Sequence, residues 1–183
     1  MLVERRYDRD RAVAYAREWA MARNPLFIDY TGFGGDCTNF VSQCLFAGSC
    51  RMNFTPVFGW YYLDADSRTA SWTGVQYFYN FLTSNRGEGP FGVETDETNL
   101  RVGDVVQLQN ADGTYYHTLL VSGFDAAGGI LVAAHSNDAY DRPLSTYTYA
   151  AARFLQVSGV RVELDVSTGS CFYDLIGGIA IRA

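Results

Sequence analysis

The sequence predicts an α+β fold in which N-terminal helices pack on an antiparallel sheet. Before residue 83, apolar residues recur mainly at the three-to-four spacing of a helix, and after residue 100 they alternate with the period of a strand. Turn signals at Asp112-Gly113 and Gly128-Gly129 separate the alternating runs, as in antiparallel hairpins. Helices followed by antiparallel strands are the pattern of the α+β class.

Three segments are expected to form helices, at residues 7–23, 37–47 and 74–82. The first is expected to end at Asn24, because the residue before Pro25 disfavours helical backbone. The second is expected to end at Gly48, a residue type that terminates helices. The polar stretch at residues 83–99 is expected to be a surface excursion.

Five alternating runs are expected to form strands, at residues 102–108, 115–124, 129–135, 154–166 and 176–181. Gly159 interrupts the fourth run and is expected to mark a β-bulge. Because neither a repeat nor a linker divides the chain, the sequence predicts one domain over residues 1–183.

Composition restricts the class of protein. With 48% hydrophobic and 19% charged residues, the 183-residue chain can bury a sizeable core. The net charge is −6, and all 14 basic residues are Arg without any basic run, so nucleic acid is not an expected partner. No apolar run approaches the roughly 18 residues that cross a membrane, and no hydrophobic region of a secretory signal follows the first residues.

The most informative segment places a cysteine at the start of the second helix. Gly34, Gly35 and Asp36 precede Cys37, which is the first residue of the helical pattern. The free N–H groups and the dipole of a helix start stabilise a thiolate. Such a thiolate is a nucleophile if an imidazole reaches it, and the absence of Lys excludes Schiff-base chemistry.

The chain has two histidines, His117 and His135, and both fall in predicted strands. They are equidistant from residue 126 in the connecting loop, so a regular hairpin would place them opposite each other on one face. One imidazole would then act as base and the other would orient it. Asn137 and Asp138 are alternative orienting groups, because a one-residue shift of register would turn His135 to the other face.

The remaining cysteines and the tryptophans carry weaker signals. Cys44 lies on the apolar side of its helix, and whether Cys50 and Cys171 pair is left open by the sequence. No Cys-x-x-Cys motif occurs and the two histidines lack a well-spaced third ligand, so no metal is expected. Segments around Trp60 and Trp72 belong to the core or, alternatively, wall a cleft.

These residues resemble a known family. The run Gly35-Asp36-Cys37-Thr38-Asn39-Phe40-Val41-Ser42-Gln43, followed by His117-Thr118 and His135-Ser136-Asn137-Asp138, closely resembles the bacterial putative amidase domain family. The resemblance covers about residues 5–155, and residues 156–183 are expected to add further strands. The order of parts is also similar to NlpC-type endopeptidases and CHAP amidases of the cell wall, which have a papain-like fold.

This resemblance implies a papain-like cysteine hydrolase that needs no cofactor. It assigns Cys37 as nucleophile and His117 as base, with His135 orienting the base and Asn137 as the alternative third residue. The candidate substrate-binding residues are Asp36, Asn39, Trp60 and Trp72. The implied substrate is a peptide or a cell-wall peptide, and the resemblance allows an exported or cell-envelope domain.

Two other functions are consistent with the same residues. The chain could be a catalytically inactive papain-like module that binds a peptide or glycan in an aromatic cleft, with Cys37 as a packing residue. It could also transfer the acyl group to an amine in place of water. The reactivity of Cys37 distinguishes the inactive module from the two enzymes.

Overall fold

The structure is a computed structural model that describes residues 1–164 and 171–182. Within these residues the strands are β1 (Leu2–Arg5), β2 (Gly89–Thr95), β3 (Val105–Gln109), β4 (Tyr115–Phe124), β5 (Ile130–Ala134), β6 (Ala139–Pro143) and β7 (Ala151–Glu163). The helices are α1 (Arg9–Trp19), α2 (Cys37–Ser49), α3 (Ala70–Thr73), α4 (Val75–Ser84) and α5 (Cys171–Ile176), and two 3-10 turns are η1 (Glu97–Asn99) and η2 (Leu144–Thr146). The predicted α+β class is confirmed.

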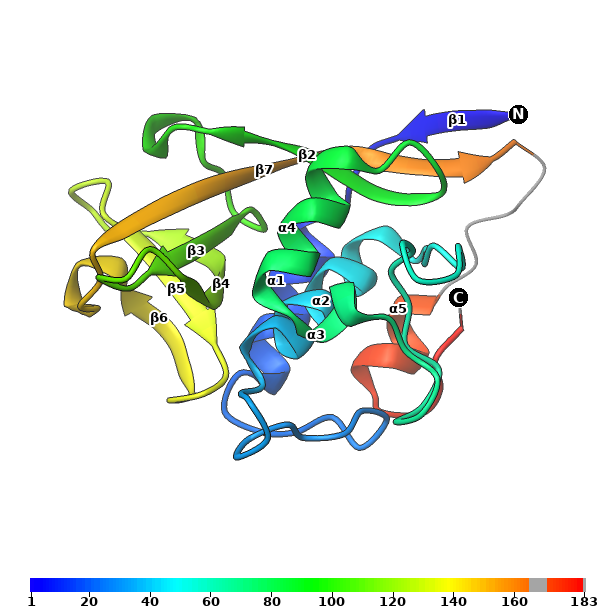
Figure 1. The fold of residues 1–183 in the computed structure, drawn as a ribbon, viewed down its shortest axis with the longest axis horizontal. Helices are drawn as coiled ribbons and strands as arrows, with labels where there is room; N and C mark the ends of the chain where they lie inside the picture. Colours follow the sequence, from blue (N-terminus) through cyan, green and yellow to red (C-terminus); the bar gives the residue numbers. More distant parts are fainter. Residues whose placement is uncertain (165–170, 183) are drawn as a thin grey trace.

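The strands form one antiparallel sheet that is organised by β7. Strands β3 and β1 follow one another along one edge of β7, and β2 pairs along its other edge. Beyond β3 the order continues through β4, β5 and β6. Figure 1 shows β7 as a long orange strand that reaches from the β3–β6 part of the sheet to β1 and β2.

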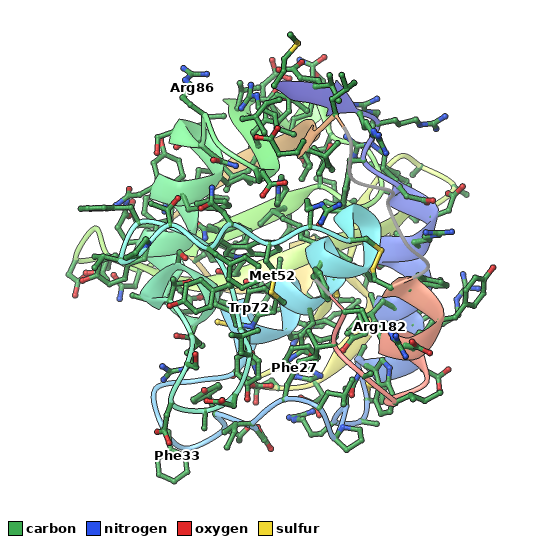
Figure 2. The ribbon with its side chains drawn as sticks, turned by 90° about the vertical axis from the view of Figure 1, so that its right-hand side faces the viewer. Phe27, Phe33, Met52, Trp72, Arg86 and Arg182 are labelled. Carbon is green, nitrogen blue, oxygen red and sulfur yellow. A yellow bond between two sulfur atoms is a disulfide. The ribbon has the colours of Figure 1, made fainter. Side chains whose placement is uncertain are left out.

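Helix α2 occupies the centre of the molecule, and all of its residues are buried. Helices α1, α3 and α5 pack around it, and strand β4 covers it from the sheet. Figure 2 shows Trp72 and Met52 beside this helix in the interior, whereas Phe33 points away from the molecule. A helix buried on every side cannot carry charged residues at low cost, and α2 has none.

The helix ends differently from the prediction. Gly48 lies inside α2, and Cys50 provides the left-handed cap with a φ of 47°. A Cβ atom on Gly48 would collide with the ring of Tyr7. The glycine is therefore required for close packing of the chain entering α1, not for terminating α2.

Successive side chains of strands β3 to β5 point to opposite faces of the sheet, so the apolar residues of these strands belong to two separate clusters. Val105, Leu120 and Ala133 face the helices and join the main core. Their neighbours on the opposite face form a second cluster, which Leu100 and Leu144 help to close. The sheet is thus buried on both faces near the site described below.

Two sequence-based expectations for strands are wrong. The segment 83–99, expected to be irregular, contains β2, which pairs with seven residues of β7. Residues 176–181, expected to be a strand, form the end of α5 and a turn. The predicted strand 154–166 is found as Ala151–Glu163, and its last two predicted residues lie outside the described part of the chain.

A disulfide joins Cys50, after the end of α2, to Cys171, the first residue of α5. It decides the pairing that the sequence left open and connects two positions 121 residues apart. Cys37 and Cys44 are free and buried. The bond attaches α5 to the central helix, so the last helix belongs to the main core.

Candidate active site

Cys37 is the first residue of α2, and two glycines shape the approach to it. Gly34 and Gly35 have φ values of 98° and 104°, a left-handed conformation that favours glycine over residues with a Cβ atom. The backbone N–H of Cys37 has no hydrogen-bond acceptor among the described residues, as expected at a helix start. Its Sγ lies 3.8 Å from the Oγ1 of Thr38, and the residue is 6% exposed.

A pair of threonines attaches strand β4 to the start of α2. The Oγ1 atoms of Thr38 and Thr118 are 2.8 Å apart, and Gln107 Nε2 donates to the Thr118 hydroxyl at 3.2 Å. Because Thr38 follows Cys37 and Thr118 follows His117, this contact brings the two candidate catalytic residues to the same point of the fold. The contact is fully buried, so it also fixes their relative position.

Cys37 and His117 line one cavity of about 370 Å³. This volume lies within the range of roughly 300–1,000 Å³ that is usual for small-molecule sites. The other residues around the cavity include Tyr116, Ser136, Asn137, Arg142, Thr146 and Tyr147. Strands β4 and β6, the turn after β5, η2 and the glycine loop therefore all contribute to its wall.

The ring of His117 has no hydrogen-bond partner among the described residues, although it is buried against Tyr116 and Tyr147. Burial is the main cause that lowers the pKa of His117 from 6.5 to about 4, and the charge of Arg142 adds to it. An imidazole without a partner that is neutral at pH 7 is able to accept a proton.

The thiol of Cys37 is also neutral at pH 7. Burial raises its pKa, while the backbone N–H of Thr118 and the hydroxyl and N–H of Thr38 lower it by smaller amounts. Cys37 and His117 therefore face the cavity as a thiol and a neutral imidazole, and not as a preformed ion pair. A proton must pass between them when a substrate reacts.

His135 has a different environment, because both of its ring nitrogens are occupied. Nε2 lies 2.8 Å from the carbonyl oxygen of Trp19, which can only accept, so Nε2 carries a proton. Nδ1 lies 2.5 Å from Asp36 Oδ2, and a contact this short requires a proton between the two atoms. The ring also stacks on Phe40, with centroids 4.1 Å apart. His135 is therefore saturated, and it is 1% exposed.

The prediction that His117 and His135 lie opposite each other is wrong for two reasons: the hairpin pairs about residue 127 and not 126, and a bulge then shifts the register. Strands β4 and β5 pair Leu120 with Ala133, so the register places Thr118, and not His117, at the level of His135. The register shifts between Val121 and Gly123, within the hairpin. A shift of one residue sends the two imidazoles to opposite faces of the sheet, so His135 does not orient His117.

Asp36 and Asn39 were expected to bind substrate, and the structure places both in the interior. Asp36 Oδ1 accepts hydrogen bonds from the N–H of Tyr30 at 2.9 Å and from Asn39 Nδ2 at 2.8 Å. Asp36 Oδ2 contacts His135 Nδ1 and also lies 3.7 Å from Arg23 Nε, so both carboxyl oxygens of Asp36 have partners. Asp36, Asn39 and His135 are each 1% exposed, and their contacts fix the loop that precedes Cys37.

Trp60 and Trp72 are fully buried and belong to the main core, so they do not line the cavity. The indole N–H of Trp60 donates to Ser42 Oγ, and that of Trp72 donates to Asn39 Oδ1. Asn137, the alternative third residue, is exposed and does line the cavity, in a left-handed turn with a φ of 75°.

The sequence-based reasoning did not identify Arg142, Tyr116 or Tyr147 as site residues, although all three line the cavity. Tyr116 adjoins His117, which is a weak signal. Arg142 and Tyr147 reach the site because β6 folds back against β5, and the sequence did not predict β6.

The sequence model of one protein family, described as a putative amidase domain, matches residues 6–157. The chain belongs to this family. The match contains Cys37, both histidines and Arg142, and it ends before the disulfide partner Cys171. The description of the family as a putative amidase domain suggests amide hydrolysis.

Two curated relatives of this putative amidase domain come from Bacillus subtilis (strain 168). The chain is 35% identical to the uncharacterized protein YhbB over 78% of this chain and 45% of that protein. It is 28% identical to the uncharacterized protein YjcM over 82% of this chain and 36% of that protein. The chain therefore spans less than half the length of either relative. No solved structure matches it.

The described residues contain no cluster of three or more His, Cys, Asp or Glu side chains that could hold a metal ion. In the same part of the chain, every helix is too short or too polar to cross a lipid bilayer.

Proposed function

We propose that this amidase domain is a cysteine amidase with Cys37 as nucleophile and His117 as general base. The observation that carries the proposal is that a cysteine at a helix start and an imidazole without a partner line the same cavity. The hydroxyl contact between Thr38 and Thr118 supports it, because that contact fixes the two elements at the required place. The arrangement resembles that of papain-like hydrolases, in which a helix start supplies the thiol and a strand supplies the base.

The mechanism follows from the neutral state of the two side chains. His117 takes the proton of the Cys37 thiol as the sulfur attacks the carbonyl carbon of the amide. The free backbone N–H of Cys37 stabilises the negative oxygen of the tetrahedral intermediate. Protonated His117 then gives its proton to the leaving amine, and water hydrolyses the thioester with His117 again accepting a proton.

Asn137 is the candidate for the third residue, since both nitrogens of His135 are used elsewhere. A peptide or cell-wall peptide is the substrate class that the family resemblance favours. An acyl-transfer reaction to an amine would use the same two side chains, and product analysis with and without added amine separates the two reactions.

The test is the rate of Cys37 alkylation by iodoacetamide between pH 4 and pH 9. If His117 accepts the thiol proton, the wild-type rate stays nearly constant from pH 8 to pH 5 and falls near pH 4, where His117 becomes protonated. In His117→Ala the rate instead falls about tenfold for each unit of decreasing pH, because only free thiolate reacts.

Mass spectrometry of the labelled peptide distinguishes Cys37 from Cys44, which is fully buried and serves as an internal control. Identical profiles for the wild type and His117→Ala would remove the proposed base. That result would favour the alternative of an inactive binding module, in which the raised pKa of Cys37 simply reflects its burial.

A further inference from the structure

Arg142 is held in a fixed position at the wall of the cavity. Its Nε donates to Thr146 Oγ1 at 2.8 Å, and its Nη2 donates to the carbonyl oxygen of Thr146 at 3.1 Å. The central carbon of the guanidinium lies 3.9 Å from the ring centroid of Tyr147. One edge of the guanidinium is therefore occupied and one face is stacked.

The opposite end of the guanidinium remains free. Nη1 has no acceptor among the described residues, and no carboxylate in that part of the chain lies within ion-pair distance of Arg142. The acidic residues nearest in sequence are used elsewhere: Asp141 accepts from Ser122 Oγ, and Asp138 pairs with Arg23. Among the described residues, the lining of the cavity thus presents one positive charge, that of Arg142, and contains no acidic residue.

We propose that Arg142 binds a carboxylate of the substrate, an inference that rests on the proposed cysteine amidase function. A fixed guanidinium with free N–H groups is suited to carboxylates, which it binds by charge-assisted and often bidentate hydrogen bonds. Because Arg142 shares the cavity with Cys37 and His117, that carboxylate lies close to the amide bond that is cleaved. The preferred substrate class is therefore an amide or peptide with a free carboxylate beside the scissile bond.

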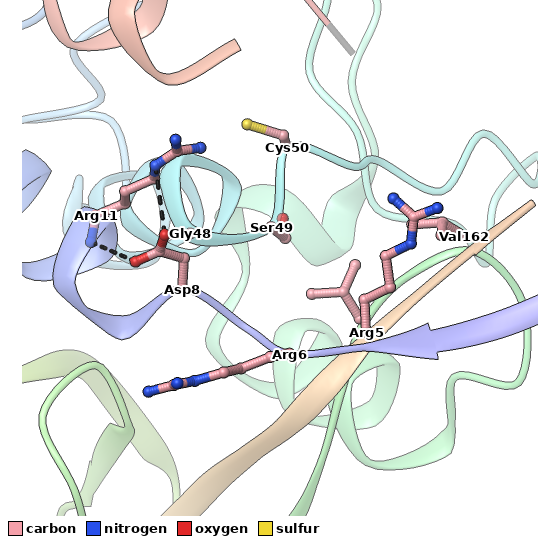
Figure 3. Close-up of a pocket in the computed structure, with 9 residues that line it drawn as sticks. Arg5, Arg6, Asp8, Arg11, Gly48, Ser49, Cys50 and Val162 are labelled. Atoms are coloured by element: carbon pink, nitrogen blue, oxygen red, sulfur yellow. Dashed lines mark hydrogen bonds and ion pairs between the residues drawn. The ribbon is translucent and has the colours of Figure 1, made fainter. Parts of the chain in front are cut away.

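A different pocket, lined by several arginines, shows why the position and pairing of an arginine matter. Figure 3 shows a pocket of about 190 Å³ beside Cys50, where Arg11 already pairs with Asp8 at 3.4 Å and Arg6 extends into solvent. It contains an acidic residue and lies away from the cavity of Cys37. Arg142 combines a fixed position, a free end and access to the nucleophile.

The experiment compares two alkylating agents that differ in charge and are otherwise alike. Iodoacetate carries a carboxylate, and iodoacetamide carries a neutral amide in its place. With either agent the Cys37 sulfur forms a bond to carbon, iodide leaves, and His117 takes the thiol proton. The measured quantity is the ratio of the iodoacetate rate to the iodoacetamide rate, divided by the same ratio for a small free thiol.

If Arg142 binds the carboxylate, the normalised ratio for the wild type is about ten, as expected for one charge-assisted hydrogen bond. In Arg142→Gln the ratio falls to about one, and in Arg142→Lys it is intermediate because the charge remains and the planar fork is lost. Added salt lowers the wild-type ratio, since the interaction is between charges.

Arg86→Gln is the matched control, because it removes the same charge from an exposed side chain, which Figure 2 shows at the edge of the molecule. Its ratio should equal that of the wild type. The iodoacetamide rate alone reports whether an Arg142 variant keeps an intact cavity, and the ratio cancels any change in the proton affinity of His117.

Each outcome has a defined meaning. A normalised ratio near one in the wild type, with iodoacetamide labelling that still depends on His117, overturns the carboxylate site and leaves the cysteine amidase intact. An unchanged high ratio in Arg142→Gln also overturns it. If labelling by iodoacetamide does not depend on His117, the proposed function itself fails, and the inference fails with it.

Discussion

The two histidines lie on or beside neighbouring strands of one sheet, yet their rings have opposite environments. His135 uses both nitrogens in hydrogen bonds, to Asp36 and to the carbonyl oxygen of Trp19, and stacks on Phe40. His117 has a cavity on one side and no hydrogen-bond partner among the described residues. Both rings are buried, so burial alone does not separate a structural histidine from a candidate base.

The difference shows what each part of the site contributes. The pair of Asp36 and His135, together with the hydrogen bond from the N–H of Asp36 to Ser136 Oγ, fixes the loop before α2. The cavity side keeps groups without a hydrogen-bond partner among the described residues, namely the backbone N–H of Cys37, the ring of His117 and Nη1 of Arg142. Saturated hydrogen bonds behind the nucleophile thus support a surface whose hydrogen-bonding groups are free for a substrate.

The largest effect on stability is expected from removing the ring of His135. His135→Ala leaves a cavity and removes the nearest partner of Asp36 Oδ2, with only Arg23 Nε remaining 3.7 Å away, and it should lower the free energy of unfolding by about 3–5 kcal/mol. Urea unfolding at pH 7 measures this change. His117→Ala is the matched control, because the imidazole that it removes has no hydrogen-bond partner within residues 1–164 and 171–182. The decrease in the free energy of unfolding should therefore be clearly smaller. Equal midpoints for the two variants would contradict the proposed division of roles.

The next effect depends on pH and concerns His117. Its pKa is about 4 in the folded state and 6.5 in the unfolded state, so the unfolded chain binds more protons between these values. The free energy of unfolding should therefore fall by about 3 kcal/mol as the pH decreases from 6.5 through 4. In His117→Asn this contribution is absent, and comparing the two proteins by urea unfolding at several pH values cancels the other titrating groups. Parallel curves would show that His117 is not desolvated.

The smallest effect is expected at the ring stack behind His135. Phe40→Leu keeps an apolar side chain but removes the aromatic contact, whose rings are 17° from parallel. The lost contact should cost about 0.5–1.5 kcal/mol beyond the change in buried area. Thermal unfolding of Phe40→Leu alone and with His135→Ala gives the coupling between the two positions. If the stability losses of the two substitutions simply add, the stack of Phe40 on His135 does not strengthen the contact between His135 and Asp36.

The sequence predicted the elements with strong local patterns. The helix that begins at Cys37 and the hairpin strands around His117 and Val132 were found near the expected positions, because apolar periodicity specifies them. Cys37 and His117, which the sequence puts forward as nucleophile and base, line one cavity in the structure. Glycines mark the turn before Cys37, and apolar residues alternate along the strand of His117. Both signals can be recognised without knowing any tertiary contact.

The remainder depended on contacts that no local pattern encodes. The β-bulge near Gly123 shifts the register between β4 and β5, and thereby changes which residue of β4 lies level with His135. The indole N–H groups of Trp60 and Trp72 found buried acceptors, so these residues entered the core. Residues 176–181 alternate like a strand. The disulfide at Cys171, however, holds the short helix α5 beside α2, and the chain turns directly after that helix.

The disulfide also divides the chain into a closed ring and two free ends. The ring runs from Cys50 to Cys171 and contains the strands β2 to β7, including His117, whereas Cys37 lies outside it. A force applied to the two ends would pull Cys37 away from His117 while the ring stayed closed. The 121 residues between the two cysteines would span about 400 Å when extended, at roughly 3.3–3.6 Å per residue. The chain cannot extend by that length while the disulfide is intact, and it can do so after reduction.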